Sequence, residues 1–109
     1  MDTITVRAVI TKNQRRGWSC QSYVKYPDWP NEIITSNGRE TLASTLWHLV
    51  MDYMDLGATL TVIQVKGKPM PRAEIWERIH KTLTGSGLSY RLPAVREYLL
   101  SQEVANGRL

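Results

Sequence analysis

The sequence of 109 residues contains no phenylalanine, a single cysteine and no apolar run near the roughly 20 residues that span a bilayer. One cysteine cannot form an internal disulfide, and the first residues lack the basic region and apolar core of a secretory signal. We therefore expect a chain without a membrane segment, located in a reducing cytoplasm. The sequence shows no internal repeat or low-complexity tract, and its length fits one compact domain.

The motifs of the common enzyme classes are also missing. The sequence has no Walker A or GxGxxG phosphate loop, no GxSxG elbow, no HExxH and no CxxC. His48 and His80 lie in predicted helices without the further ligands that zinc requires. Asp52 and Asp55 share one side of a predicted helix, a spacing that is commoner on a solvated face than in acid–base or metal chemistry. We predict a protein that is not an enzyme and has no metal or cofactor.

The net charge of +4 is unevenly spread along the chain. Residues 1–36 carry five Lys/Arg against three Asp/Glu, residues 37–65 carry one against three, and residues 66–109 carry eight against four. This distribution is compatible with a nucleic acid, with an acidic protein partner or with solubility alone.

Alternation of apolar and polar residues predicts a β-hairpin over residues 3–26. Its second strand places Trp18, Cys20 and Val24 on one face, so we interpret the cysteine as a core residue and not as a reactive thiol. Residues 32–35 are a candidate for a short third strand. The polar loop of the hairpin holds three cations that could meet phosphate, an acidic partner or only water, namely Lys12, Arg15 and Arg16.

Apolar residues recur at helical spacing within residues 36–57, and this spacing predicts the first helix of the chain. Asn37 and Glu40 resemble a capping box at the start of this helix, and Gly57 is a natural left-handed stop. A strand is expected over residues 58–65, and the basic segment 66–71 with its prolines is interpreted as a linker and the best candidate for a hinge.

Two further helices are predicted after the linker, the first opening with Pro71 and the second ending at Gly107. The order of elements predicts one α+β domain. It would contain an antiparallel sheet, made of the hairpin plus one or two further strands, with a helix packed across it and a C-terminal two-helix segment. In this division residues 1–65 form the β-β-α-β layer and residues 72–109 form a helical hairpin that either packs on the layer or projects from it.

Tryptophan and tyrosine are abundant, with four and five residues respectively. Both combine apolar area with a polar atom, which suits half-wet sites and interface anchors. We interpret Trp47 and Trp76 as core residues. In contrast, proline-stiffened segments are preordered for docking, which favours exposed side chains in the loop after the hairpin and in the linker. The predicted partner-binding set joins these side chains to the hairpin cations: Tyr26, Trp29, Met70, Lys12, Arg15 and Arg16.

The C-terminal segment 73–109 resembles a helix-turn-helix. One helix ends near a glycine turn, a second helix carries two arginines, and "NGRL" is similar to the start of a wing. In that family the second helix enters the major groove. The turn is longer than usual, and no first helix of a three-helix core is evident. The alternative interpretation is therefore a small DNA- or RNA-binding regulator, with a basic contact set of Lys66, Lys68, Arg72, Arg91 and Arg96.

In size, compactness and lack of a catalytic set, the chain resembles the small accessory proteins of phages and other mobile elements. These include inhibitors of host nucleases, restriction systems and CRISPR complexes. The resemblance implies a viral anti-defence role, with a host protein or a protein–nucleic-acid complex as the partner. The leading hypothesis is a non-enzymatic protein-binding module that modulates or inhibits a nucleic-acid-processing complex.

Overall fold

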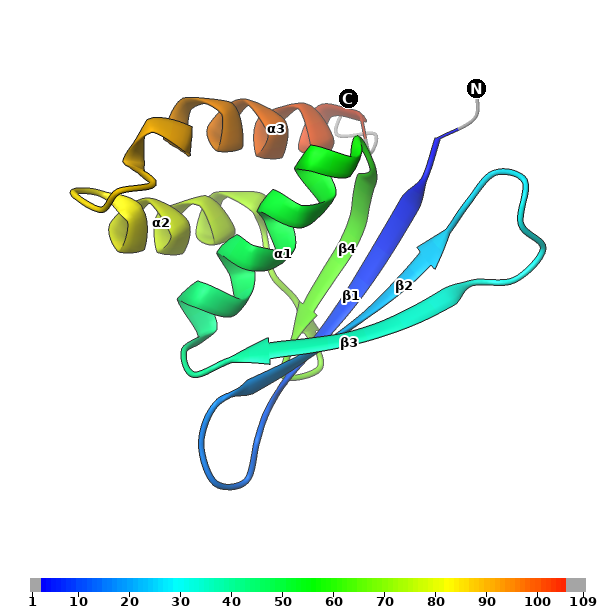
Figure 1. Cartoon of the computed structure of the whole chain (residues 1–109), viewed down its shortest axis with the longest axis horizontal. Helices are drawn as coiled ribbons and strands as arrows, with labels where there is room; N and C mark the ends of the chain where they lie inside the picture. Colours follow the sequence, from blue (N-terminus) through cyan, green and yellow to red (C-terminus); the bar gives the residue numbers. More distant parts are fainter. Residues whose placement is uncertain (1–2, 106–109) are drawn as a thin grey trace.

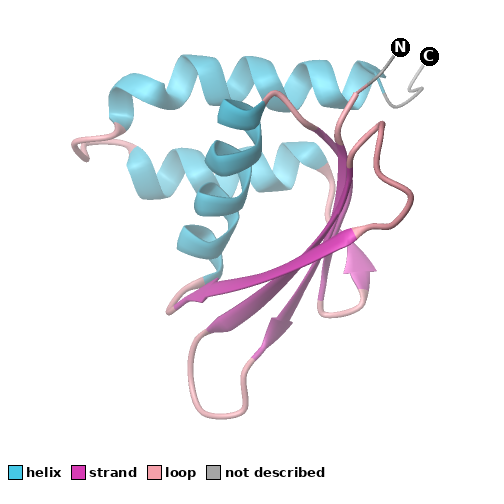
Figure 2. Ribbon diagram, turned by 45° about the vertical axis from the view of Figure 1, so that its right-hand side comes forward, coloured by secondary structure: helices cyan, strands magenta, loops and turns pink. Residues whose placement is uncertain are grey.

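The computed structural model describes residues 3–105, with side chains as far as residue 101. It is an α+β fold in which a five-stranded sheet carries all the described helices on one face (Figures 1 and 2). The elements follow in the order β1 (Thr5–Lys12), β2 (Trp18–Lys25), β3 (Ile33–Arg39), α1 (Leu42–Leu56), β4 (Thr59–Val65), β5 (Lys68–Pro69), α2 (Arg72–Leu83), η1 (Ser89–Arg91) and α3 (Leu92–Ala105).

The sheet has the strand order β3-β2-β1-β4-β5. Neighbouring strands are antiparallel, except that β1 and β4 are parallel. The prediction of an antiparallel sheet was therefore wrong, and the sheet is mixed and larger than expected. The cause is α1, which carries the chain from the end of β3 back across the sheet, so that β4 runs in the same direction as β1 and β3.

The core lies between the sheet and the helices. In β1 the residues that face the helices, Val6, Ala8 and Ile10, are buried, as the alternation predicts. Cys20 is only 3% exposed, which confirms its interpretation as a core residue. The three helices contribute an apolar stripe each, with Leu46, Leu49, Val50, Ile75, Ile79, Leu83, Val95 and Leu99 buried.

The region that joins β3 to α1 differs from the prediction. β3 continues as far as Arg39, and Asn37 pairs with Cys20 across the sheet, so Asn37 does not cap the helix. The cap is Thr41, whose hydroxyl oxygen accepts a hydrogen bond of 3.0 Å from the Ser44 backbone N–H. The capping box of Asn37 and Glu40 was thus wrong, because strand pairing with β2 prevails over the local side-chain signal. The stop at Gly57 is confirmed by its φ of 78°.

Segment 66–71, predicted as a linker, contains a tight turn and strand β5. Lys66 and Gly67 both have positive φ, of 54° and 82°, which is typical of a two-residue hairpin turn. The Met70 N–H donates to the Ile63 carbonyl oxygen at 2.8 Å and so fixes the segment to β4. Beyond it, α2 and α3 lie side by side and antiparallel, and both pack against α1 (Figures 1 and 2). The helical pair therefore packs on the layer and does not project from it.

Candidate docking edge, pocket and basic end

β3 forms an outer edge of the sheet and pairs only with β2. All of its residues are exposed or half-buried, and Ile33 and Ile34 are 40% and 58% exposed. Proteins usually shield such an edge with lysine, proline, a bulge or a very short strand. β3 has seven residues, "IITSNGR", and none of them is lysine or proline. This edge is therefore an open template for a further strand.

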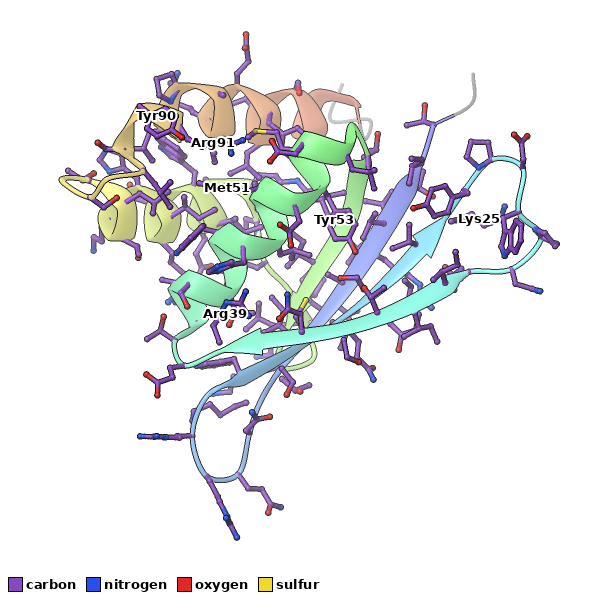
Figure 3. The ribbon with its side chains drawn as sticks, in the orientation of Figure 1. Lys25, Arg39, Met51, Tyr53, Tyr90 and Arg91 are labelled. Atoms are coloured by element: carbon purple, nitrogen blue, oxygen red, sulfur yellow. The ribbon has the colours of Figure 1, made fainter. Side chains whose placement is uncertain are left out.

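The loop that precedes β3 holds two of the predicted partner-binding residues. Trp29 is 55% exposed, whereas Tyr26 is half-buried and packs against the core. The Lys25 ammonium group donates to the carbonyl oxygens of Tyr26, at 2.8 Å, and of Trp29, so it closes the loop from inside (Figure 3). The structure thus presents Trp29 on an ordered loop next to the open edge.

A pocket of about 250 Å³ lies between β3 and α1. Sequence reasoning did not identify it, because its walls are far apart in the chain. Buried residues of β2 and α1 form its inner end, and polar side chains form its rim. The rim consists of Thr35, Asn37 and Arg39 from β3, and of His48, Asp52 and Tyr53 from α1.

Both ring nitrogens of His48 make hydrogen bonds. Its Nδ1 lies 2.8 Å from the Ser44 carbonyl oxygen, which can only accept, so Nδ1 carries the hydrogen. Its Nε2 then accepts from the Arg39 Nε at 3.2 Å. The ring also stacks on Trp47 at 3.8 Å. With both nitrogens engaged, His48 does not offer a free general base.

Cys20 lies at the inner end of the same pocket. Burial raises the pKa of its thiol, and the hydrogen bond with the Ser22 hydroxyl at 3.9 Å opposes this only in part. Within residues 3–105, the Ser22 hydroxyl is the only hydrogen-bond partner of the Cys20 sulfur, so His48 does not activate the sulfur. A protonated, buried thiol is a poor nucleophile. The geometry is that of a packed side chain.

Asp52 and Asp55 have different surroundings although they share α1. Asp55 pairs with Arg91, whose Nη2 lies 2.6 Å from the Asp55 Oδ1, and this hydrogen bond raises the pKa of the Arg91 guanidinium. The Asp52 carboxylate is exposed at the pocket rim, and it has no hydrogen bond or ion pair within the described part of the chain. No cluster of three or more His, Cys, Asp or Glu among residues 3–105 is placed to hold a metal.

Cations predicted for two different partners come together at one end of the sheet. The Lys66 N–H donates to the Ile10 carbonyl oxygen at 3.0 Å, which places the β4–β5 turn beside the β1–β2 loop. An open groove of about 660 Å³ there contains Trp18, Lys66, Lys68 and Met70. Glu40 and Glu74 line the same groove. We call this end of the sheet, with Lys12, Arg15 and Arg16 at the β1–β2 turn and Lys66 and Lys68 at the β4–β5 turn, the basic end.

Two members of these predicted sets are less available than expected. Met70 lines the groove but is half-buried against the core, since its backbone is tied to β4. Arg72 is 8% exposed and donates to the Leu60 carbonyl oxygen, so little of its side chain is available for the predicted contact with nucleic acid. The reason is that α2 begins at Arg72, and its first turn lies over β4.

The remaining arginines do not extend the basic end. Arg91, the last residue of η1, is held by Asp55 and lies far from the β4–β5 turn in the view of Figure 3. Arg96 is exposed on α3. Moreover, α2 and α3 are antiparallel, whereas the helices of a helix-turn-helix cross at roughly 90–120°. The proposed wing, residues 106–109, lies outside the described residues.

No protein family, curated protein or solved structure matches the chain. None of the helices described in residues 3–105 is long and apolar enough to cross a membrane. The function is therefore inferred from the site alone.

Proposed function

We propose that this protein is a non-enzymatic protein-binding module that docks on its partner through β3. We further propose that the partner belongs to a nucleic-acid-processing complex, which the protein modulates or inhibits as phage anti-defence proteins do. The observation that supports docking best is the seven-residue edge strand without lysine or proline, next to the exposed Trp29. Strand addition uses the backbone groups of such an edge.

Both faces of the edge offer apolar contact to an added strand. Ile33 pairs with the buried Val24 and thus faces the helix layer, whereas Ile34 pairs with Tyr23 and faces the open side of the sheet. Each new backbone hydrogen bond contributes about 0.5–1.5 kcal/mol, and burial of the two isoleucines and Trp29 adds to this. These contributions favour an interface that is centred on one strand.

The basic end supports the nucleic-acid part of the proposal. Within residues 3–105, Lys12, Arg15, Lys66 and Lys68 have no carboxylate within ion-pair distance. Arg16 pairs with Glu40 at 3.7 Å, but both side chains are so exposed that the pair contributes little. These cations are available to an acidic surface or to the phosphates of a nucleic acid held by the partner.

Affinity capture with matched variants tests docking through β3. Ile34→Lys places a charge on the edge, and Val62→Lys makes the same change on the open face of β4, away from the edge. We expect wild type and Val62→Lys to retain one stoichiometric partner from a lysate of the natural host, with or without nuclease, and Ile34→Lys to lose it. Retention of that partner by Ile34→Lys, or capture of no stoichiometric partner at all, would contradict the proposal.

A second candidate function is direct binding of single-stranded nucleic acid at the basic end. It is favoured by Trp18, whose ring lies 5.7 Å from the Lys12 Nζ and among the unpaired cations. Aromatic stacking combined with phosphate contacts is typical of such sites. Fluorescence anisotropy with a labelled oligonucleotide would then show binding that weakens steeply with salt. Lys66→Glu with Lys68→Glu should abolish it, and Arg96→Glu should not.

A further inference from the structure

We propose that the pocket between β3 and α1 receives a lysine or arginine side chain from the strand that docks on β3. This inference rests on the proposed function, and it names the chemistry of the partner at that site. It assigns a role to Asp52, Tyr53 and Thr35, none of which the docking argument itself requires.

The pairing of β3 with β2 determines where the side chains of an added strand lie. Thr35 and Asn37 pair with the buried residues Ser22 and Cys20, so they face the helix layer, and they line the pocket. Paired strands keep their side chains on matching faces, with a period of two residues. Every second side chain of a strand added to β3 therefore points to the side of the pocket, with α1 as the facing wall. A peptide in such a groove obtains affinity from its backbone and specificity from the pocket.

Two opposite charges, those of Arg39 and Asp52, lie at the rim of the pocket. Arg39 donates through its Nε to His48 Nε2 at 3.2 Å, and through its Nη1 to Asn37 Oδ1 at 2.8 Å and to the Gly38 carbonyl oxygen at 2.6 Å. Arg39 keeps its positive charge, since no carboxylate lies within ion-pair distance of it among residues 3–105. Asp52 is the one carboxylate among the residues that line the pocket, and no hydrogen bond or ion pair within residues 3–105 engages it.

Two hydroxyl groups complete the recess. The Thr35 Oγ1 and the Tyr53 hydroxyl lie 3.4 Å apart, one on each wall, and Tyr53 points from α1 toward the sheet (Figure 3). Their oxygens can accept from an ammonium or guanidinium group that pairs with Asp52. A glutamate or aspartate at this position would instead meet the negative Asp52. Next to Asp52 and these two hydroxyl groups, the pocket therefore favours a basic side chain.

The test uses seven-residue peptides of alternating threonine and valine that differ only at the central residue, which is arginine, glutamate or norleucine. Binding is followed by isothermal titration and by the amide shifts of β3 in the full-length protein. We expect the arginine peptide to bind about fivefold more tightly than the norleucine peptide, the range of a partly exposed ion pair. The glutamate peptide should bind most weakly.

Variants separate the two levels of the inference. Asp52→Asn should remove the preference for arginine and leave the norleucine affinity unchanged, whereas the control Glu97→Gln on α3 should change neither. One outcome is that Ile34→Lys abolishes binding of all three peptides while Asp52→Asn changes nothing. This outcome would support docking on β3 and overturn the inference that the pocket selects a basic side chain. If none of the peptides shifts the β3 amides, both are overturned. Sedimentation of the protein alone completes the test, because a dimer that Ile34→Lys dissolves would identify the occupant as a second copy and overturn the inference.

Discussion

The two edges of the sheet are constructed in opposite ways. β5 has two residues, a lysine and a proline, and the next residue but one is again a proline, Pro71. β3 has seven residues and carries exposed isoleucines. Short length, lysine and proline are the devices that prevent edge-to-edge association, and the chain places all three on one side only. The comparison teaches that the open edge at β3 is a local property and not a general lack of protection.

The largest effect is expected from a change that separates β3 from β2. A Cβ atom on Gly38 would lie 2.1 Å from the Trp18 carbonyl oxygen, so Gly38→Ala forces two backbones apart. We expect a loss of about 3 kcal/mol in the free energy of unfolding, measured by urea denaturation. Gly87→Ala is the control, since its Cβ would have no neighbour within 4 Å, and it should change stability by less than about 0.5 kcal/mol. Equal stability of the two variants would show that β3 is not held closely.

A smaller effect is expected on the protected side, where α3 is tied to the chain just before β4. The Tyr98 hydroxyl donates to the Ala58 carbonyl oxygen at 2.6 Å. Tyr98→Phe should cost about 1 kcal/mol in urea denaturation. Val95→Ala at the buried centre of α3 should cost more, because it removes core volume.

Tyr98 also predicts a pH dependence. Burial raises the pKa of Tyr98 to about 12, above its ordinary value of 10.0. The folded state therefore holds this proton more tightly than the unfolded state does, and the stabilisation is complete below pH 10.0 and lost as the pH rises to about 12. Denaturation across this range should show a steeper fall for wild type than for Tyr98→Phe. Identical slopes would mean that Tyr98 is not buried as described.

The ion pair between Asp55 and Arg91 sharpens the comparison on the helical side. Its distance is short, at 2.6 Å, but Asp55 is largely exposed. Asp55→Asn should therefore cost only about 0.5 kcal/mol, and 1 M salt should weaken the wild type toward the variant. A cost of several kcal/mol would show that η1 depends on this pair. Asp52→Asn, which breaks no contact within residues 3–105, should be neutral in the same measurement.

The smallest effect on stability, but a direct test of the comparison, is expected from removing the protection of β5. Lys68→Val with Pro69→Val should change the free energy of unfolding by less than about 0.5 kcal/mol. The variant should nevertheless self-associate at lower concentration than wild type in light scattering, because the second edge becomes a template. Adding Ile34→Lys to this variant should reduce its self-association, because the β3 edge then carries a charge. If the β5 variant stays monomeric, lysine and proline are not what protects this edge.

Local patterns predicted much of the fold. Alternation in β1 and β2 placed Cys20 in the core, and the periodicity of α1 and the glycine at its end were readable from the sequence. The parallel pairing of β1 with β4 could not be predicted from the sequence, since the order of strands depends on how α1 crosses the sheet. Asn37 shows the same limit at a single residue, because its capping signal is local and its pairing with β2 is not.

The candidate sites were predictable only in part. Exposure of Trp29 followed from its loop, and the lack of lysine and proline in "IITSNGR" was a signal that could have indicated the open edge. The pocket was not predictable, since it requires residues of β3 and α1 to meet across two layers. Arg72 was misplaced because a basic residue after a proline is typical of a surface, and only the packing of α2 shows that it is buried.

The parallel pairing of β1 and β4 has a consequence for the newly synthesised chain. Thr5 pairs with Thr59, so the inner side of β1 stays without a neighbour until β4 (Thr59–Val65) has left the ribosome. The first three strands can pair as a meander by then, because their contacts are local. During this interval the nascent chain exposes a second edge, and α1 and β4 close it when they arrive. Premature strand exchange is therefore expected at β1 during translation, and at β3 in the finished protein.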